Sequence, residues 1–268
     1  MNKDKYNLSI ILPVLNERKN LEFLVPELSL ILDKTCDQFE IIVIDDNSND
    51  NTDQLLIEFK EKFNINYRIR RQNNSLSLSI LEGVNIAEYS NLMWFDADGS
   101  VDINSIEKLI NFHRSEQESV FIGSRFVNGG GYKGQLKYNK SIFNTLRNIK
   151  NSEDSIVAIY LSVIFNKILN IILKIHVKDL TSGFIIGKKE YFVKDMFENF
   201  YYGEYFINVV TKLYLSKTQI REVPFINKPR IYGKSKTSTN IFRLLQLSLP
   251  YIKQAILCKR LLKHENFR

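Results

Sequence analysis

The most informative stretch of this sequence is Leu92-Met93-Trp94-Phe95-Asp96-Ala97-Asp98. A short apolar run bounded by turn-forming residues predicts a buried strand over Leu92 to Phe95. Asp96 and Asp98 stand directly at its carboxyl end, the edge at which open α/β sheets bind ligands. Two such carboxylates suit a divalent cation bound together with a diphosphate. The alternative is that one of them only caps the helix predicted over Ile103 to His113.

Strand-like and helix-like segments alternate through the first half of the chain. The predicted strands are 8–12, 40–44, 66–70, 92–95 and 120–123, and the predicted helices between the first four are 20–32, 52–63 and 79–87. This alternation predicts an α/β fold with a doubly wound, mostly parallel sheet that has helices on both faces.

Length, charge and cysteine content narrow the class of protein. A chain of 268 residues is long enough for one large domain or two small ones, and its net charge of +7 favours an acidic partner. The basic residues do not form one stripe with interleaved aromatics, so we do not expect nucleic-acid binding. Cys36 and Cys258 show neither metal-ligand spacing nor a disulfide pattern. With no apparent secretory signal at the start, the sequence predicts a cytoplasmic protein.

Two apolar segments follow in the second half. Residues 156–175 carry too many asparagines and lysines for a membrane-spanning helix, which predicts a buried or interfacial amphipathic helix. Residues 241–262 predict a last helical stretch, interrupted at Pro250, with basic residues among leucines and isoleucines. Such a segment either lies on an anionic membrane or packs on the domain with a solvated basic face.

Polar side chains follow the first two strands as well. Asn16 and Glu17 come after Pro13, and Asp45 and Asp46 follow the second strand. Carboxylate and amide groups at strand ends can accept hydrogen bonds from a nucleobase and from ribose hydroxyls. A turn with a helix cap is the alternative, but a cap needs one such residue rather than two adjacent carboxylates. Together with the aspartate pair above, these groups predict a nucleotide site.

This set of motifs resembles the inverting family 2 glycosyltransferases, which have a GT-A fold. Further matching motifs are Gly123-Ser124-Arg125, Gly129-Gly130-Gly131, Asp179-Leu180-Thr181-Ser182-Gly183-Phe184, Glu222-Val223-Pro224-Phe225 and Arg230-Ile231-Tyr232-Gly233-Lys234-Ser235-Lys236. The series is similar to the branch typified by dolichol-phosphate mannosyltransferase and the bacterial polyprenyl-phosphate glycosyltransferases. The match runs from about Ile10 to Lys236.

The resemblance assigns roles to individual residues. The donor-nucleotide positions are Pro13, Asn16, Glu17, Asp45, Asp46 and Asp96. Asp96 and Asp98 match the pair that holds Mg²⁺ or Mn²⁺, and Arg125 matches an arginine that faces the acceptor phosphate. The positions of a phosphate-binding loop are Arg230, Lys234, Ser235 and Lys236.

The implied reaction is metal-dependent, inverting transfer of a hexosyl group from a GDP- or UDP-linked sugar to a polyprenyl or dolichyl phosphate. A lipid phosphate is already an anion and needs no general base. The alternative is a saccharide acceptor in surface polysaccharide synthesis, whose hydroxyl demands a base, for which Asp179 and Glu204 are the candidates. We expect a catalytic domain over 1–236 and an amphipathic extension over 237–268, peripheral on the cytoplasmic face of the membrane.

The sequence also departs from the family pattern. Ser75-Leu76-Ser77 stands where members often have Gly-Leu-Gly, and Ser79 stands where a small alanine is usual. Ser162 and Asn166 match a Ser-x-x-x-Asn motif, but Ala158 occupies the neighbourhood in which the lipid-phosphate branch often carries a second arginine. A nucleotide-sugar-binding protein without turnover is therefore a further alternative.

Overall fold

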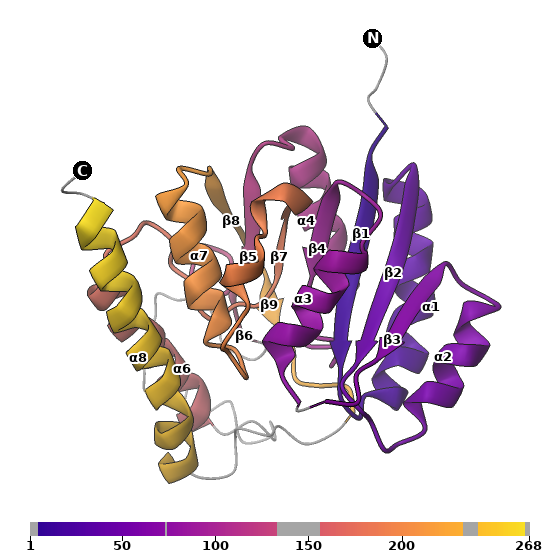
Figure 1. Ribbon diagram of the computed structural model, residues 1–268, viewed down its shortest axis with the longest axis horizontal. Coiled ribbons are helices and arrows are strands. Elements are labelled where there is room, and N and C mark those ends of the chain that lie inside the picture. Colours follow the sequence, from indigo (N-terminus) through magenta and orange to yellow (C-terminus); the bar gives the residue numbers. More distant parts are fainter. Residues whose placement is uncertain (1–4, 73, 133–155, 233–240, 266–268) are drawn as a thin grey trace.

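A seven-stranded sheet forms the centre of the computed structural model, which describes residues 5–72, 74–132, 156–232 and 241–265 (Figure 1). The strand order is β3-β2-β1-β4-β7-β5-β8. The strands are β1 (Asn7–Val14), β2 (Gln38–Asp45), β3 (Ile65–Ile69), β4 (Asn91–Trp94), β5 (Val120–Ser124), β7 (Ile185–Lys188) and β8 (Ile220–Pro224). Two short strands, β6 (Gly131–Tyr132) and β9 (Ile226–Asn227), pair separately.

The sheet is mixed but mostly parallel, as predicted. β7 runs antiparallel to both neighbours, β4 and β5, whereas every other pair in the seven-stranded sheet is parallel. The sequence predicted neither β7 nor β8. β7 has only four residues and β8 carries Arg221 and Glu222 among its five, so neither contains a long apolar run.

Helices cover both faces of the sheet (Figure 1). The helices are α1 (Arg18–Thr35), α2 (Thr52–Lys60), α3 (Leu76–Ile86), α4 (Ile103–Ser115), α6 (Ile156–Leu173), α7 (Tyr205–Leu215) and α8 (Ile241–Glu265), with the short 3₁₀ helices η1 (Lys189–Tyr191) and η2 (Lys194–Met196). One apolar core joins the sheet to α1, α2 and α4, and a second joins it to α3, α6, α7 and α8.

The strands supply both cores because successive side chains point to opposite faces. In β1, Ile10 and Leu12 pack in the core of α1, α2 and α4, whereas Ile11 packs in the core of α3. Gly83 lets α3 approach closely, since a Cβ at this position would overlap the Ile11 side chain. The prediction of helices on both faces of the sheet is therefore confirmed.

The long helix α8 differs from the prediction at one position. We expected an interruption at Pro250, but α8 is continuous from Ile241 to Glu265. Proline removes one helical hydrogen bond, to the carbonyl four residues earlier. That carbonyl belongs to Gln246, and both residues are exposed, so water can satisfy it. Ala255 and Cys258 on the buried face of α8 join the core. The expected boundary at residue 236, between a catalytic domain and an amphipathic extension, stays a prediction.

Strand register brings the predicted polar strand ends to one edge. Val14 at the end of β1 lies opposite Asp45 at the end of β2, and Trp94 at the end of β4 lies opposite Ile11. The residues that follow these strands therefore meet at the carboxyl edge of the sheet, where α/β folds bind ligands. Within the described ranges, every helix is too short or too polar to cross a membrane.

Candidate active site

A cavity of about 280 Å³ opens at this carboxyl edge. Its walls come from the ends of β1, β2 and β4, the start of α3 and two later segments. The lining residues are Pro13, Val14, Leu15, Glu17, Asp46, Asn74, Ser75, Leu76, Ser79, Asp96, Ala97, Asp98, Tyr201, Tyr202 and Arg230. The cavity thus brings together six predicted site residues, namely Pro13, Glu17, Asp46, Asp96, Asp98 and Arg230.

Asp96 and Asp98 present their carboxylates differently. Asp98 is buried and accepts a hydrogen bond from the Ser100 N–H at 2.9 Å. Asp96 faces the open cavity, and its carboxylate accepts no hydrogen bond from any residue in the described ranges. Partial loss of hydration in the cavity raises the pKa of Asp96 above its ordinary value, and the charge of Asp98 acts in the same direction.

Neither aspartate caps α4. That role belongs to Asp102, whose carboxylate accepts from the Ser105 N–H at 3.1 Å. The alternative, that one aspartate of the pair caps this helix, is therefore excluded.

Arg230 lies directly on this acidic pair. Its Nε stands 3.1 Å from Asp98 Oδ2, and its Nη1 stands 3.5 Å from Glu17 Oε1. The backbone on either side is fixed, because the Lys228 N–H donates to the Ser100 carbonyl at 2.8 Å and the Ile231 N–H approaches the Asp98 carbonyl at 3.3 Å. Arg230 is therefore held at the cavity with a cation directed at its acidic wall.

Of the two adjacent aspartates at the end of β2, Asp46 is the one that lines the cavity. Its carboxylate forms a buried ion pair with Arg70 and accepts from the Ser75 N–H at 2.6 Å. Arg70 also donates to Ser79 Oγ at 2.9 Å. Burial raises the pKa of Asp46, while the Arg70 charge opposes that change. The serines at 75 and 79, noted as departures from the family pattern, are thus parts of this network.

Asp45 and Asn16 shape the turns beside the cavity and do not line it. Both the N–H and the hydroxyl of Ser48 donate to Asp45 Oδ1, at 3.1 and 2.5 Å. Asn16 adopts a left-handed backbone with φ of 59° and ties the two turns together, since its N–H donates to Ser48 Oγ at 2.7 Å and its Oδ1 accepts from the Asn49 N–H at 2.8 Å. Asn residues adopt this conformation at a modest cost.

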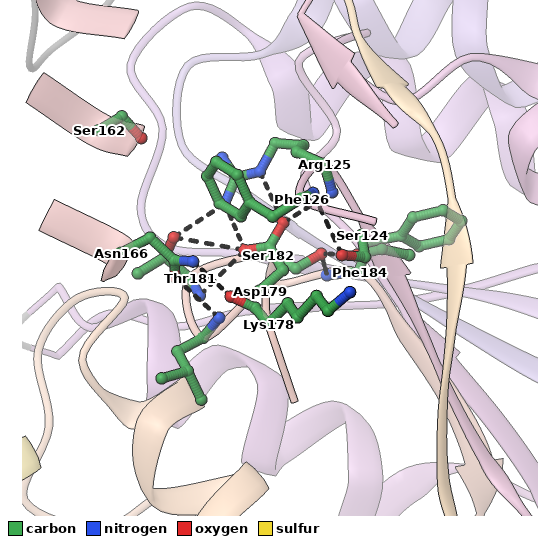
Figure 2. Close-up of polar contacts among 12 residues, drawn as sticks. Ser124, Arg125, Phe126, Ser162, Asn166, Lys178, Asp179, Thr181, Ser182 and Phe184 are labelled. Atoms are coloured by element: carbon green, nitrogen blue, oxygen red, sulfur yellow. Dashed lines mark hydrogen bonds and ion pairs between the residues drawn. The ribbon is translucent and has the colours of Figure 1, made fainter. Parts of the chain in front are cut away.

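A second polar cluster centres on Arg125 and Asp179 (Figure 2). Arg125 donates to Asp179 Oδ2 from Nε at 2.9 Å and to Oδ1 from Nη2 at 2.8 Å, and its N–H adds a bond of 2.9 Å to Oδ2. The side chain of Asp179 is fully buried and that of Arg125 is 12% exposed. Burial alone would lower the pKa of Arg125, but the charge and hydrogen bonds of Asp179, together with nearby Tyr132 and Asp96, raise that pKa. In this arrangement Asp179 positions Arg125.

Aromatic rings and α6 complete this second cluster. The Arg125 guanidinium lies 5.3 Å from the centre of the Phe126 ring and 5.6 Å from that of Tyr132, within range of a cation–π interaction. The Tyr132 hydroxyl and Ser162 Oγ are 2.9 Å apart. Asn166 Oδ1 accepts from the Leu180 N–H at 3.0 Å, which fixes the loop that carries Asp179. The Ser-x-x-x-Asn motif thus supports the arginine from α6.

Some predicted residues stand apart from these clusters. Lys234, Ser235 and Lys236 lie outside the described residues. Glu204, a candidate base, accepts at Oε1 from the Tyr201 N–H at 3.0 Å and from the Tyr202 N–H at 3.4 Å. The sequence predicted no role for Arg70, Tyr201 or Tyr202. Two adjacent tyrosines before Gly203 are the local pattern that marks this segment.

The sequence profile of Glycosyl transferase family 2 matches residues 9–195, which include the cavity's strand ends and the Arg125–Asp179 cluster. The chain belongs to this family. The predicted family and enzyme class are therefore confirmed.

Individual relatives are similar to this chain over part of its length. A dolichol-phosphate mannosyltransferase of Pyrococcus furiosus is 32% identical over 50% of this chain and 38% of its own length. The poly(ribitol-phosphate) β-N-acetylglucosaminyltransferase TarP of Staphylococcus aureus is 27% identical over 46% of this chain and 38% of its own length. The chain therefore spans well under half the length of these curated relatives.

A solved structure extends the likeness of the fold. Glucosyl-3-phosphoglycerate synthase from Mycobacterium tuberculosis, in complex with Mn²⁺, uridine diphosphate and phosphoglyceric acid, aligns with a TM-score of 0.63. The alignment covers 95% of this chain and 78% of that one, at 14% identity. At this identity the comparison supports the GT-A fold alone, which agrees with the predicted fold class.

The residues at the cavity fit a hard divalent cation. Mg²⁺ and Mn²⁺ prefer carboxylate oxygens, and Mg²⁺ keeps waters and substrate phosphates in its other positions, so one or two protein carboxylates suffice. Asp96 offers a carboxylate free of hydrogen bonds from the described residues, and Asp98 is one residue away. No group of three or more His, Cys, Asp or Glu side chains suited to a metal occurs among the described residues.

Proposed function

We propose that this chain transfers a hexosyl group from a GDP- or UDP-linked sugar to a polyprenyl or dolichyl phosphate, with inversion at the anomeric carbon. The convergence of Asp46, Asp96, Asp98 and Arg230 on one cavity carries this proposal. It combines acids suited to a nucleoside, carboxylates suited to a metal and a cation suited to phosphate. The mannosyltransferase relative supports the acceptor class.

The donor side uses charges that the fold already holds in place. Asp96 and Asp98 would hold Mg²⁺ or Mn²⁺, which when bound would neutralise the charge of the leaving nucleoside diphosphate. Arg230 adds a second positive charge at the same place, held by contacts of its backbone neighbours. Asp46, Pro13 and Glu17 would line the nucleotide end of the cavity.

The acceptor side is built around Arg125. A lipid phosphate is an anion at neutral pH, so the enzyme has to position it and need not deprotonate it. Arg125 is largely buried and lies against the rings of Phe126 and Tyr132, in an orientation fixed by Asp179. A bidentate partner leaves the remaining guanidinium donors in a defined direction, which suits capture of a second anion. Arg125 would bind the acceptor phosphate, and Asp179 is its positioning residue.

A saccharide acceptor is the second candidate, and one observation favours it. Glu204 borders the tyrosines at the cavity rim and uses only Oε1 in the hydrogen bonds to their backbones. Oε2 could then take the proton from an attacking hydroxyl. Asp179 suits this task less, because both of its oxygens already accept from Arg125. The TarP relative, named for N-acetylglucosamine transfer to poly(ribitol phosphate), supports this alternative.

We also propose that the protein lies on the cytoplasmic face of the membrane. Exposed apolar side chains lie on α6, with Ile171 69% exposed, and on α8, with Leu249 62% exposed. Lys253 and Arg260 are also on α8. Apolar and basic side chains together suit an anionic lipid surface near a long prenyl acceptor. Co-sedimentation with anionic vesicles at low salt tests this, and a protein that stays in the supernatant contradicts it.

Radiolabelled nucleotide sugars, tested in turn with a short polyprenyl phosphate and Mg²⁺ or Mn²⁺, test the proposed reaction. Label that enters the organic phase and is released by mild acid identifies a glycosyl phosphodiester, and it names the donor. Alkali-stable label on a soluble saccharide moves the protein to the second candidate. Absence of transfer to either acceptor class, with a folded protein and the full donor panel, contradicts both.

A further inference from the structure

Two adjacent tyrosines stand exposed at the rim of the cavity. Tyr201 is 71% exposed and Tyr202 is 40% exposed, and both line the space that Asp96 and Arg230 also line. Large aromatic side chains normally bury most of their surface, and exposed ones next to a cavity mark contact surfaces. Neither ring belongs to the two apolar cores, so packing within the protein does not account for them.

The backbone that carries these rings is firmly held. The Tyr201 carbonyl accepts from the Leu76 N–H at 3.0 Å, which ties the segment to the first turn of α3. On the other side, Glu204 Oε1 accepts from the backbone N–H groups of both tyrosines. Gly203 lies against α8, and any side chain there would overlap the Tyr251 hydroxyl. The tyrosines are therefore fixed in place rather than carried on a loose loop.

Two serine hydroxyls fasten the preceding residues. Ser75 Oγ donates to the Phe200 carbonyl at 2.8 Å, and Ser77 Oγ donates to the Phe197 carbonyl at 2.5 Å. Both serines are buried, and glycine at either position could not form these bonds. The Ser75-Leu76-Ser77 run therefore joins the donor end of the cavity to the segment that presents the tyrosines.

The chemistry of the rim favours a sugar ring as the partner of these tyrosines. The face of an aromatic ring carries partial negative charge, and the C–H groups on one face of a pyranose are both apolar and weakly positive, so the two stack. Tyr202 lines the same cavity as Asp96 and Asp98. A sugar attached to a diphosphate held there would come next to the tyrosines.

We infer that Tyr201 and Tyr202 form a stacking wall for a pyranose ring, and that Ser75, Ser77 and Glu204 hold this wall in place. The inference rests on the proposed function and names a sugar subsite within it. The ring belongs either to the transferred hexosyl group of the donor or to a saccharide acceptor, since both present the same C–H face.

Calorimetric titration in the presence of Mg²⁺ separates the sugar from the nucleotide. UDP and UDP-glucose form one pair of probes, and GDP and GDP-mannose form the other. Tyr202→Ala and Tyr201→Ala should weaken binding of the nucleotide sugar about three- to ten-fold while leaving binding of the nucleoside diphosphate unchanged. Tyr202→Phe keeps the ring and should bind the nucleotide sugar as the wild type does.

Tyr214→Ala is the matched control, because Tyr214 is 39% exposed and lies on α7 outside the cavity. It should change neither affinity. Thermal unfolding of each variant shows that the protein remains folded. Because these are binding measurements, selective loss of sugar affinity in a protein that shows no turnover would support the wall while contradicting the proposed transfer.

A saccharide acceptor gives a different pattern. Unchanged donor affinities, with weaker binding of free glucose, mannose or N-acetylglucosamine to the UDP-loaded variants in saturation-transfer NMR, would support the wall and assign it to the acceptor. Equal weakening of nucleoside diphosphate and nucleotide sugar would show contact with the nucleotide and overturn the inference. Unchanged binding of every probe would also overturn it.

Ser77→Ala tests the positioning role. The substitution removes the bond to the Phe197 carbonyl, and it should weaken nucleotide-sugar binding in the wild-type background. In a Tyr201→Ala, Tyr202→Ala background the same substitution should have no further effect on sugar affinity, because the wall is already gone. An equal loss in both backgrounds would show that Ser77 acts only on general stability.

Discussion

The side-chain amide of Asn20 pairs with the backbone of Tyr232 in both directions. The Tyr232 N–H donates to Asn20 Oδ1 at 3.1 Å, and Asn20 Nδ2 approaches the Tyr232 carbonyl at 3.3 Å. The same Nδ2 donates to Glu17 Oε2 at 2.5 Å, and Glu17 in turn lies beside Arg230. Asn20 is 3% exposed and sits in the first turn of α1. One buried amide therefore fastens the segment that brings Arg230 to the acidic pair.

Asn20→Ala should lower kcat/KM about ten-fold, because Arg230 loses the support of both Glu17 and the Tyr232 backbone. Hydrogen exchange at the Tyr232 amide should become faster in the same variant. When Arg230 is already alanine, adding Asn20→Ala should lower activity little further. Full additivity of the two losses would contradict the role of Asn20 in positioning Arg230.

Asn91→Ala is the control for this prediction. Asn91 is also 3% exposed and donates to the Asn7 carbonyl at 2.8 Å, but it lies at the amino end of β4, away from the cavity. Its loss should reduce stability without changing exchange at Tyr232. A similar change in both variants would mean that exchange at Tyr232 reports global stability.

Breaking the Arg125–Asp179 ion pair should lower the free energy of unfolding much more than replacing both residues with apolar ones. Asp179→Asn should lower the free energy of unfolding by about 3 kcal/mol, because it leaves the buried Arg125 charge without its partner. Arg125→Met combined with Asp179→Leu should cost less, since no charge is then buried alone. Urea unfolding measures both. A single variant that is more stable than the double variant would contradict this account.

The sequence predicts a feature of this structure best when the residues that form it are close together along the chain. The strand ends were predictable because each motif directly follows its own apolar run, as Asp96 and Asp98 follow β4. Pairing across the chain was not, because Asn20 and Tyr232 are 212 residues apart and nothing local marks either as a partner. The local pattern likewise offered Asp179 as a base, whereas its carboxylate is bound to Arg125, 54 residues away.

The roles of several side chains near the cavity could likewise not be predicted from the sequence. Ser75 and Ser77 were visible as departures from a glycine pattern, but their purpose appears only when the segment before Tyr201 is seen to lie against α3. Asp45 and Asp46 are adjacent and chemically identical, yet one shapes a turn and the other lines the cavity. The alternation of side chains along the backbone at a strand end decides between them, and it depends on where the strand stops.

His113 predicts a pH dependence of stability that is independent of the cavity. It is fully buried on α4, with its Nδ1 2.7 Å from the Tyr6 hydroxyl. Burial lowers the pKa of His113 to about 4, and the Lys188 charge acts in the same direction. Below its ordinary pKa of about 6.5 the unfolded histidine binds a proton that the folded one does not. Stability is therefore complete above pH 6.5 and falls as the pH drops towards 4.

The loss over this interval should approach about 3 kcal/mol for the His113 contribution. His113→Gln cannot take up the proton, so its free energy of unfolding should fall less between pH 7 and pH 4. Urea unfolding of both proteins across this range gives the difference. Parallel curves for wild type and variant would show that His113 does not titrate in this way.

Metal-dependent transfer in the wild type and in Asp98→Asn tests whether this cavity is the active site. Asparagine keeps the shape of the side chain but removes the charge that a divalent cation requires. With a radiolabelled donor, a short polyprenyl phosphate and Mn²⁺, the wild type should place label in the organic phase, lose this activity with chelator and regain it when Mn²⁺ returns. Asp98→Asn should stay folded and lose at least about a hundred-fold in rate, a magnitude typical of removing one electrostatic contact to the transition state. Transfer that persists in Asp98→Asn, or in chelator, would contradict the assignment of this cavity as the metal-dependent active site.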